Sequence, residues 1–200
     1  MKHAICISLI CLPLLVHTAR AQEPQEASKP ATKLDAFQAR TGVVIVRGFA
    51  AVGTIAGTGN GTIAVDACEF KTANDPTLRT TGVRFAVKES LRLERENTVF
   101  IDSDEIDSLL AGIDYIAKAS AAVTELNSFE VEYRTKGEFR IVVFNAPSGK
   151  LSAAVSAGRI GRTTVFLSME QLQELRGLII AAKGKVTGKV TGKRSQGPFE

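Results

Sequence analysis

The sequence predicts an α+β fold, in which antiparallel sheets carry two helices and two ββββα units form one domain. Two observations lead to this fold class. About four strand-like segments precede one segment whose apolar residues have helical spacing, and the same order then repeats. The body of about 150 residues between two polar flanks also has the size of one ordinary domain.

The first unit is expected over about residues 42–121. Its strands are predicted from β-branched runs and from alternation of apolar and polar side chains. The segments are Val43–Val46, Ile63–Ala67, Val83–Val87 and Thr98–Asp102. A helix is predicted over 104–119 from the spacing of its apolar residues. We expect Asp102 to cap this helix, with Glu105 as the reciprocal partner.

Four glycines lie between the first two predicted strands, at Gly53, Gly57, Gly59 and Gly61. They match neither the P-loop pattern nor the complete dinucleotide-binding pattern G-x-G-x-x-G. A phosphate loop would also need a helix N-terminus behind it, and the sequence continues as an alternating strand. Asn60-Gly61 is a preferred pair for a type I′ turn, so we interpret the segment as a hairpin.

The second unit is expected over about 127–183. Its predicted strands are Phe129–Arg134, Phe139–Phe144, Leu151–Ser156 and Thr163–Leu167. In the helix that follows, Ser168 and Gln171 form a capping box and Gly184 is placed to end it. We expect each unit to be a curved sheet with its own helix across the concave side. A mixed sandwich or barrel with two covering helices is the competing architecture.

The two ends of the chain differ from this body, which is expected as a single domain over 34–183. Residues 1–21 have the basic start, short apolar run and small-x-small cleavage pattern of a signal peptide. The apolar run is too short to span a bilayer comfortably. Polar residues 22–33 are expected to be a disordered leader, and 184–200 a disordered, basic, low-complexity tail. The mature protein is therefore predicted to be secreted or periplasmic, without a transmembrane segment.

Cleavage after Ala21 would remove both histidines, His3 and His17, and leave Cys68 as the one cysteine of a chain that has no tryptophan. No Ser-His-Asp or Cys-His system, histidine-ligated zinc site or intrachain disulfide can then form. We expect no catalytic residues, no metal and no cofactor. Pairing of Cys68 between chains and the oligomeric state stay open.

Several segments resemble a group of exported bacterial proteins of unknown function: Ile101–Leu109, Gly112–Ile116 and Phe129–Gly137. This resemblance implies export and a shared fold, and it brings no activity or site residues. The order of elements and the strand-to-helix run at 163–179 resemble the β4α units of the PC4, Whirly and Pur-α group of single-strand-binding folds. That resemblance is one of topology and implies no function.

Basic side chains supply the candidate ligand contacts. Arg159 and Arg162 lie in a glycine-containing turn that is able to bind a carboxylate or phosphate, or is an ordinary solvated hairpin. Lys185, Lys189 and Lys193 belong to the tail. The tail is either a solubilising segment or a basic arm for an anionic surface.

Acidic side chains suggest two further chemistries. Glu130 and Glu132 share one strand face, so they are candidates for an acid–base pair of a hydrolase or for salt bridges on an exposed sheet. The cluster from Asp102 to Asp107 does not meet the EF-hand pattern, and carboxylates are favourable at a helix N-terminus.

These observations favour a non-catalytic exported domain that binds an unknown protein or envelope component. The alternatives are a carboxylate-based hydrolase that uses Glu130 and Glu132, and a binder of polyanions or single-stranded nucleic acid. With 25 basic and 21 acidic residues the whole chain has a net charge of +4. The segment from Lys183 onward contains five basic residues and one acidic residue.

Overall fold

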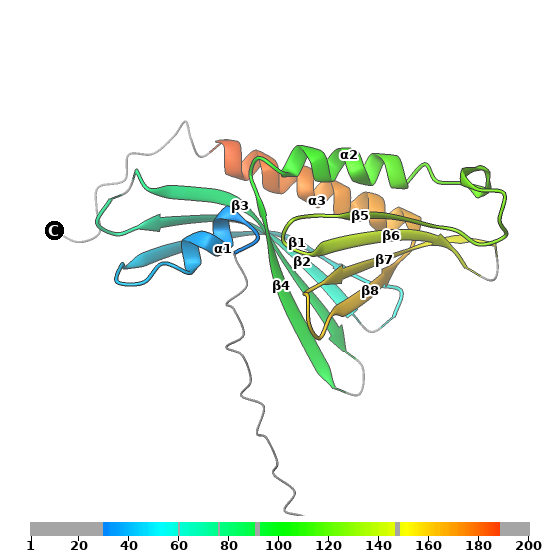
Figure 1. The fold of residues 1–200 in the computed structure, drawn as a ribbon, viewed down its shortest axis with the longest axis horizontal. Helices are drawn as coiled ribbons and strands as arrows, with labels where there is room; N and C mark the ends of the chain where they lie inside the picture. Colours follow the sequence, from blue (N-terminus) through cyan, green and yellow to red (C-terminus); the bar gives the residue numbers. More distant parts are fainter. Residues whose placement is uncertain (1–29, 60, 76, 91–92, 147–148, 189–200) are drawn as a thin grey trace, which may run out of the picture.

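The computed structural model describes residues 30–59, 61–75, 77–90, 93–146 and 149–188. It confirms the α+β fold class, because two antiparallel four-stranded sheets are each followed in the chain by a helix (Figure 1). Strands are neighbours in chain order in both sheets, β1-β2-β3-β4 and β5-β6-β7-β8. Each unit is thus a four-stranded meander plus one helix.

The elements of the first unit are long, and a short helix precedes them. Their bounds are α1 Lys33–Gln38, β1 Ile45–Ala56, β2 Gly61–Thr72, β3 Arg79–Ser90, β4 Glu94–Asp102 and α2 Ile106–Ile116. The second unit has shorter strands and a longer helix. Its bounds are η1 Ala121–Val123, β5 Glu130–Arg134, β6 Phe139–Asn145, β7 Leu151–Ala157, β8 Thr163–Leu167 and α3 Met169–Gly188.

The two helices lie side by side along one side of the molecule, and each covers the sheet of the other unit (Figure 1). α2 packs against β5 and β6, whereas α3 packs mainly against β1, β2 and β3. The expectation that each helix covers its own sheet is therefore wrong. An apolar stripe specifies that a helix face is buried, but it does not specify which sheet buries it.

The exchange of helices produces one core shared by both units. The core contains side chains from both sheets and from α2 and α3. At its centre the rings of Phe85 on β3 and Phe139 on β6 are stacked, with 4.2 Å between centroids. At the helix pair, Arg176 donates to both carboxylate oxygens of Asp114, at 2.6 and 2.7 Å.

The glycine-rich segment is the hairpin between β1 and β2, as predicted. The Gly57 N–H donates to the Gly61 carbonyl at 2.8 Å, and Gly61 lies within β2. Asn60 lies outside the described residues, and the type I′ turn predicted at Asn60-Gly61 lies outside them with it. A methyl group on Gly57 would lie 2.5 Å from Val165 Cγ1, so glycine here permits close packing against β8.

The helix ends confirm one predicted cap and correct another. Ser168 and Gln171 form the predicted capping box at α3, with bonds of 2.8 and 3.2 Å. The Asp102 side chain does not cap α2. Its carboxylate accepts hydrogen bonds from the backbone N–H groups of Lys33 and Leu34, at 2.7 and 3.1 Å.

The boundaries of the domain also differ from the prediction at both ends. Thr32 caps α1, so the last residues of the expected leader are part of the folded body. α3 continues past Gly184 to Gly188, because Val186 still packs as a buried residue one turn beyond Ala182. Residues 1–29 and 189–200 lie outside the described residues, as do the predicted signal peptide and most of the tail.

Candidate functional site

The predicted arginine turn is the β7–β8 hairpin. Gly158 and Gly161 have φ values of 97° and 62°, a backbone conformation that favours glycine. Arg159 lines a hollow with Asp35 and Glu138, and its Nε lies 3.9 Å from Glu138 Oε1. Arg162 does not line that hollow and makes no ion pair with any residue that the structure describes. The acidic lining makes this hollow a poor receptor for an anion.

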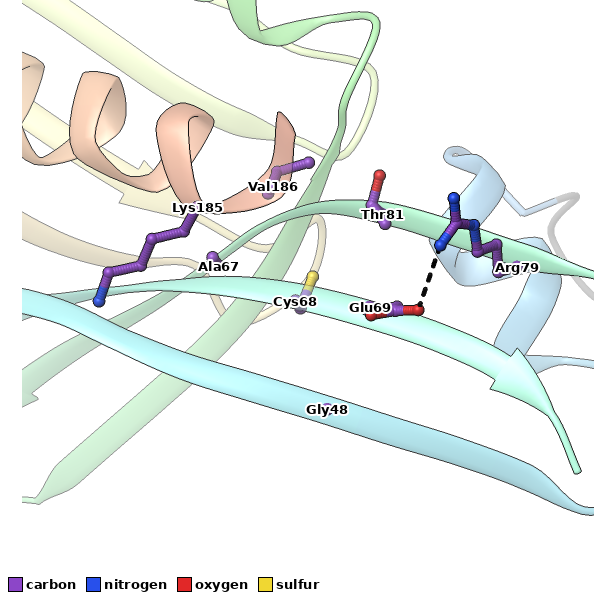
Figure 2. A pocket seen from close by; sticks show the side chains of 8 residues that line it. All are labelled: Gly48, Ala67, Cys68, Glu69, Arg79, Thr81, Lys185 and Val186. Carbon is purple, nitrogen blue, oxygen red and sulfur yellow. Dashed lines mark ion pairs between the residues drawn. The ribbon is translucent and has the colours of Figure 1, made fainter. Parts of the chain in front are cut away.

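Lys185 lies near the end of α3, at a small hollow that we call the α3-end hollow (Figure 2). It is lined by Gly48, Ala67, Cys68, Glu69, Arg79, Thr81, Lys185 and Val186. The Lys185 ammonium donates to the backbone carbonyl of Ala51 on β1 at 2.7 Å. Lys185 is therefore tied to the sheet edge. Lys189 and Lys193 lie outside the described part of the chain.

Cys68 on β2 lines the α3-end hollow, but its thiol is expected to be unreactive. Its side chain is buried, in a cluster with Leu34, Phe37 and Phe70. Burial raises the pKa of the thiol to about 12, although the nearby Arg84 acts in the opposite direction. A thiol of this kind supplies almost no thiolate at neutral pH.

Glu130 and Glu132 lie on the outer face of the second sheet, on β5. The Glu132 carboxylate is held between two guanidinium groups, those of Arg134 at 3.1 Å and of Arg140. The hydrogen bond from Arg140, followed by that from Arg134, holds the pKa of Glu132 below its usual range. This carboxylate is ionised and paired. The arrangement is that of salt bridges on an exposed sheet face, and it differs from the geometry of an acid–base pair.

The acidic cluster from Asp102 to Asp107 is used for structure. Asp102 binds the start of α1, Asp104 pairs with Lys33 at 2.6 Å and Asp107 pairs with Lys183. Glu105 accepts a hydrogen bond from the Lys136 N–H at 2.9 Å. Within the described ranges no cluster of three or more His, Cys, Asp or Glu side chains could hold a metal ion.

The outer face of the first sheet carries arginines stacked on phenylalanines. The Arg84 guanidinium lies 4.3 Å from the ring centroid of Phe49, and the Arg47 guanidinium lies 5.8 Å from that of Phe70. Phe70 in turn contacts Phe49 and Phe100 edge-to-face, at 5.9 and 5.5 Å. Arg84 also pairs with the buried Asp66 at 2.6 Å. Arg47 makes no ion pair with a described residue and so remains a free cation.

α1, the start of β1 and the β2–β3 turn meet at one end of this sheet (Figure 1). Exposed apolar side chains lie on the strand and turn segments. We define the α1-end patch by these residues, with their exposed fractions: Val43 45%, Val44 64%, Val46 38%, Phe49 44% and Leu78 47%. Backbone bonds hold them together, because Ala73 N–H donates to the Val44 carbonyl at 2.9 Å and Thr72 N–H to the Leu78 carbonyl at 3.2 Å.

Cations surround the α1-end patch. A shallow hollow between α1 and the β2–β3 turn is lined by Lys33, Ala36, Phe37, Arg40, Thr77, Leu78, Arg79 and Thr80. Among the residues that the structure describes, no acidic side chain lines it. Arg40 lies over the Phe37 ring, at 4.3 Å from its centroid.

Sequence reasoning missed the α1-end patch for two reasons. Val43–Val46 was predicted as a strand, and apolar residues in a strand are ordinarily buried. No helix is predicted at 33–38, where the expected leader meets the expected domain, so its contact with this sheet was not foreseen. The alternation Arg47-x-Phe49 was the one available signal for a stacked arginine and aromatic face.

No protein-family model and no curated protein matches the chain. Among solved structures, it is similar to WHY1 from Arabidopsis thaliana, with 13% identity and a TM-score of 0.33 over 73% of this chain and 95% of that chain. Of the helices that the structure describes, none has the length and apolar character needed to cross a membrane.

Proposed function

We propose that this protein is a non-catalytic, exported domain that binds a protein partner through the α1-end patch. The observation that carries the proposal is the gathering of exposed apolar side chains and guanidinium groups on one end of the first sheet. Aromatic and arginine side chains with an apolar centre are the residue types that carry most binding energy in protein interfaces.

The composition of the patch fits a macromolecular surface better than a small-molecule site. Phe49 and Val46 lie on opposite faces of β1, and Val43 and Val44 directly precede this strand, so the patch follows the start of the strand and does not form a cleft. Exposed apolar side chains that are concentrated in one part of a folded domain favour an interaction surface, because their exposure to water is unfavourable without a partner.

The hydrolase alternative is not supported by the geometry. Glu132 is paired with two arginines, and Glu130 lies exposed on the same sheet face. The arginines hold Glu132 in its ionised form, and Glu130 is exposed, so neither side chain has the buried environment of a general acid.

Site-specific photo-cross-linking in the native envelope tests the proposal. A photoreactive residue at Val44 or at Phe49 is expected to capture the same partner. The matched control is Ile160, which is 86% exposed but lies on the β7–β8 turn, away from the patch. Val44→Asp should then weaken binding of the purified partner at least about tenfold, because it places a charge in an apolar contact. Equal capture from Ile160, or unchanged binding of Val44→Asp, contradicts the proposal.

A polyanion is the second candidate partner, and the unpaired Arg47 and the acid-free hollow near Arg40 favour it. Binding of a labelled oligothymidylate would then fall steeply with salt and fall further in Arg40→Gln/Arg47→Gln. Salt-independent binding, or none, removes this candidate.

A further inference from the structure

We propose that Ile45–Ala50, the open half of the free edge of β1, accepts an extended segment of the partner as an added fifth strand. This inference rests on the proposed function, since it specifies how the partner meets the α1-end patch. It also specifies the chemistry of that segment, which alternates β-branched residues and includes an acidic residue.

The free edge of β1 is protected along only half of its length. β1 pairs on one side with β2 and is the first strand of its sheet. Along its C-terminal half, α3 side chains bind the strand: Lys185 donates to the Ala51 carbonyl and Gln171 donates to the Ala56 carbonyl, both at 2.7 Å. Leu178 of α3 also lies close over Gly53. No α3 side chain is recorded bonding the backbone of Ile45–Ala50 among the described residues.

The position of the Ala51 carbonyl indicates which groups of the open half face outward. In an extended antiparallel strand, the N–H and C=O of one residue point to the same side, and successive residues alternate. The register with β2 is unbroken from Ile45 to Ala51. Because the Ala51 carbonyl points away from β2 to Lys185, the backbone groups of Phe49, Arg47 and Ile45 point outward as well. They form a row of donors and acceptors at the hydrogen-bonding spacing of a new strand.

The open half lacks the features by which sheet edges avoid pairing. Ile45–Ala50 contains no proline and no lysine, and Arg47 is its single charge. Natural edge strands are usually blocked by such residues, by bulges or by a covering element. The irregularity in β1 falls between Ala51 and Gly53, beyond the open half. An unblocked edge is the receptor in strand-addition recognition.

The two faces of the open half define the incoming side chains. On one face lie Ile45, Arg47 and Phe49, so an added strand would place an acidic residue beside Arg47 and β-branched residues on either side of it. On the other face lie Val46, Gly48 and Ala50, which suit β-branched side chains. The recognised segment therefore carries one acidic residue among alternating Val, Ile or Thr residues.

A synthetic peptide with alternating valines, acetyl-Thr-Val-Glu-Val-Thr-Val-amide, is the probe, and the full chain is the receptor. Fluorescence anisotropy measures its dissociation constant, and hydrogen exchange maps where the backbone becomes protected. We expect protection at 45–50 and at least a tenfold loss of affinity when alternate peptide nitrogens are methylated, because methylation removes the bonds to the edge. A Glu-to-Lys peptide should bind more weakly to the natural protein and more tightly to Arg47→Glu.

The outcomes separate this inference from the proposed function. Equal binding of the methylated peptide overturns strand addition and leaves the photo-cross-linking result as the independent test of the patch. Protection outside 45–50, no peptide binding, or an unchanged charge preference in Arg47→Glu also overturns it. Sedimentation of the protein alone gives the last outcome: a dimer that dissociates in Arg47→Pro would make the occupant a second copy of β1, which overturns the assignment to a partner segment.

Discussion

Adding one methyl group to α2 tests the exchange of helices between the two units. Gly112 of α2 faces the Tyr133 ring on β5, and a Cβ at position 112 would lie 2.3, 2.6 and 2.6 Å from three ring carbons. Gly177 of α3 is the matched control, because a Cβ there has no neighbour within 4 Å. Both glycines lie inside helices.

The expected free energies follow from two opposing effects. Replacing glycine by alanine in a helix interior stabilises by about 1 kcal/mol. Overpacking against a ring that has to shift costs about 1–3 kcal/mol. Gly177→Ala should therefore raise the free energy of unfolding by about 1 kcal/mol, and Gly112→Ala should lower it by about 1 kcal/mol at the middle of that range.

Urea denaturation followed by circular dichroism measures both variants under the same conditions. In a Tyr133→Leu background, Gly112→Ala should become stabilising, because the obstructing ring is gone. If Gly112→Ala stabilises the natural protein as much as Gly177→Ala does, α2 does not lie on β5, and the exchanged packing is wrong.

Three further predictions concern single groups. The pKa of Cys68 is raised from 9.0 to about 12, so its thiol should carry about a thousandfold less thiolate than an ordinary cysteine. Iodoacetamide should therefore label Cys68 only after denaturation. Rapid labelling of the native protein would contradict its burial. The stability that this shift contributes is present below pH 9 and is lost as the pH rises toward 12. The hydrogen bond from Arg176 lowers the pKa of Asp114 from 3.8, so its contribution is present above that pH and is lost as the pH falls. Asp114→Asn should accordingly reduce the loss of stability on acidification to about pH 3, as measured by urea midpoints. Asp102→Ala should lower the free energy of unfolding by about 1–3 kcal/mol, because the buried N–H of Leu34 loses its acceptor. Hydrogen exchange in 33–38 should become faster in this variant. Unchanged exchange would mean that other contacts hold α1.

The fold class could be predicted because the burial of one face of a strand or helix imposes a periodic spacing of apolar residues on the local sequence. Alternation in β2, β3 and β5 and the helical spacing in α2 and α3 gave the right element types and order. The capping box at Ser168 and Gln171 was predictable for the same reason, since both partners lie within one turn. The prediction of a helix cap failed where a residue with the sequence position of a cap instead bonds a segment far away in the chain. Asp102 had the position of a cap for α2, and it instead binds the start of α1 from 68 and 69 residues away.

The candidate site was less predictable than the fold. Arg159 and Lys185 were chosen as ligand contacts for their charge, and the structure pairs one with Glu138 and bonds the other to the Ala51 carbonyl. Exposure of Val44 and Phe49 cannot be inferred from residue type, because an apolar strand residue is buried or exposed according to what covers it. Export and the cleavage point after Ala21 stay predictions of the sequence.

By itself, the sequence determined the order of the eight strands and of the two long helices that the structure describes, and their division into two ββββα units. These properties depend on residues a few positions apart or on composition. Only the tertiary structure decided which helix covers which sheet, and therefore which half of β1 is protected by Lys185 and Gln171 and which half is open. That choice depends on how apolar faces of similar size combine across the whole chain, and no local pattern specifies it.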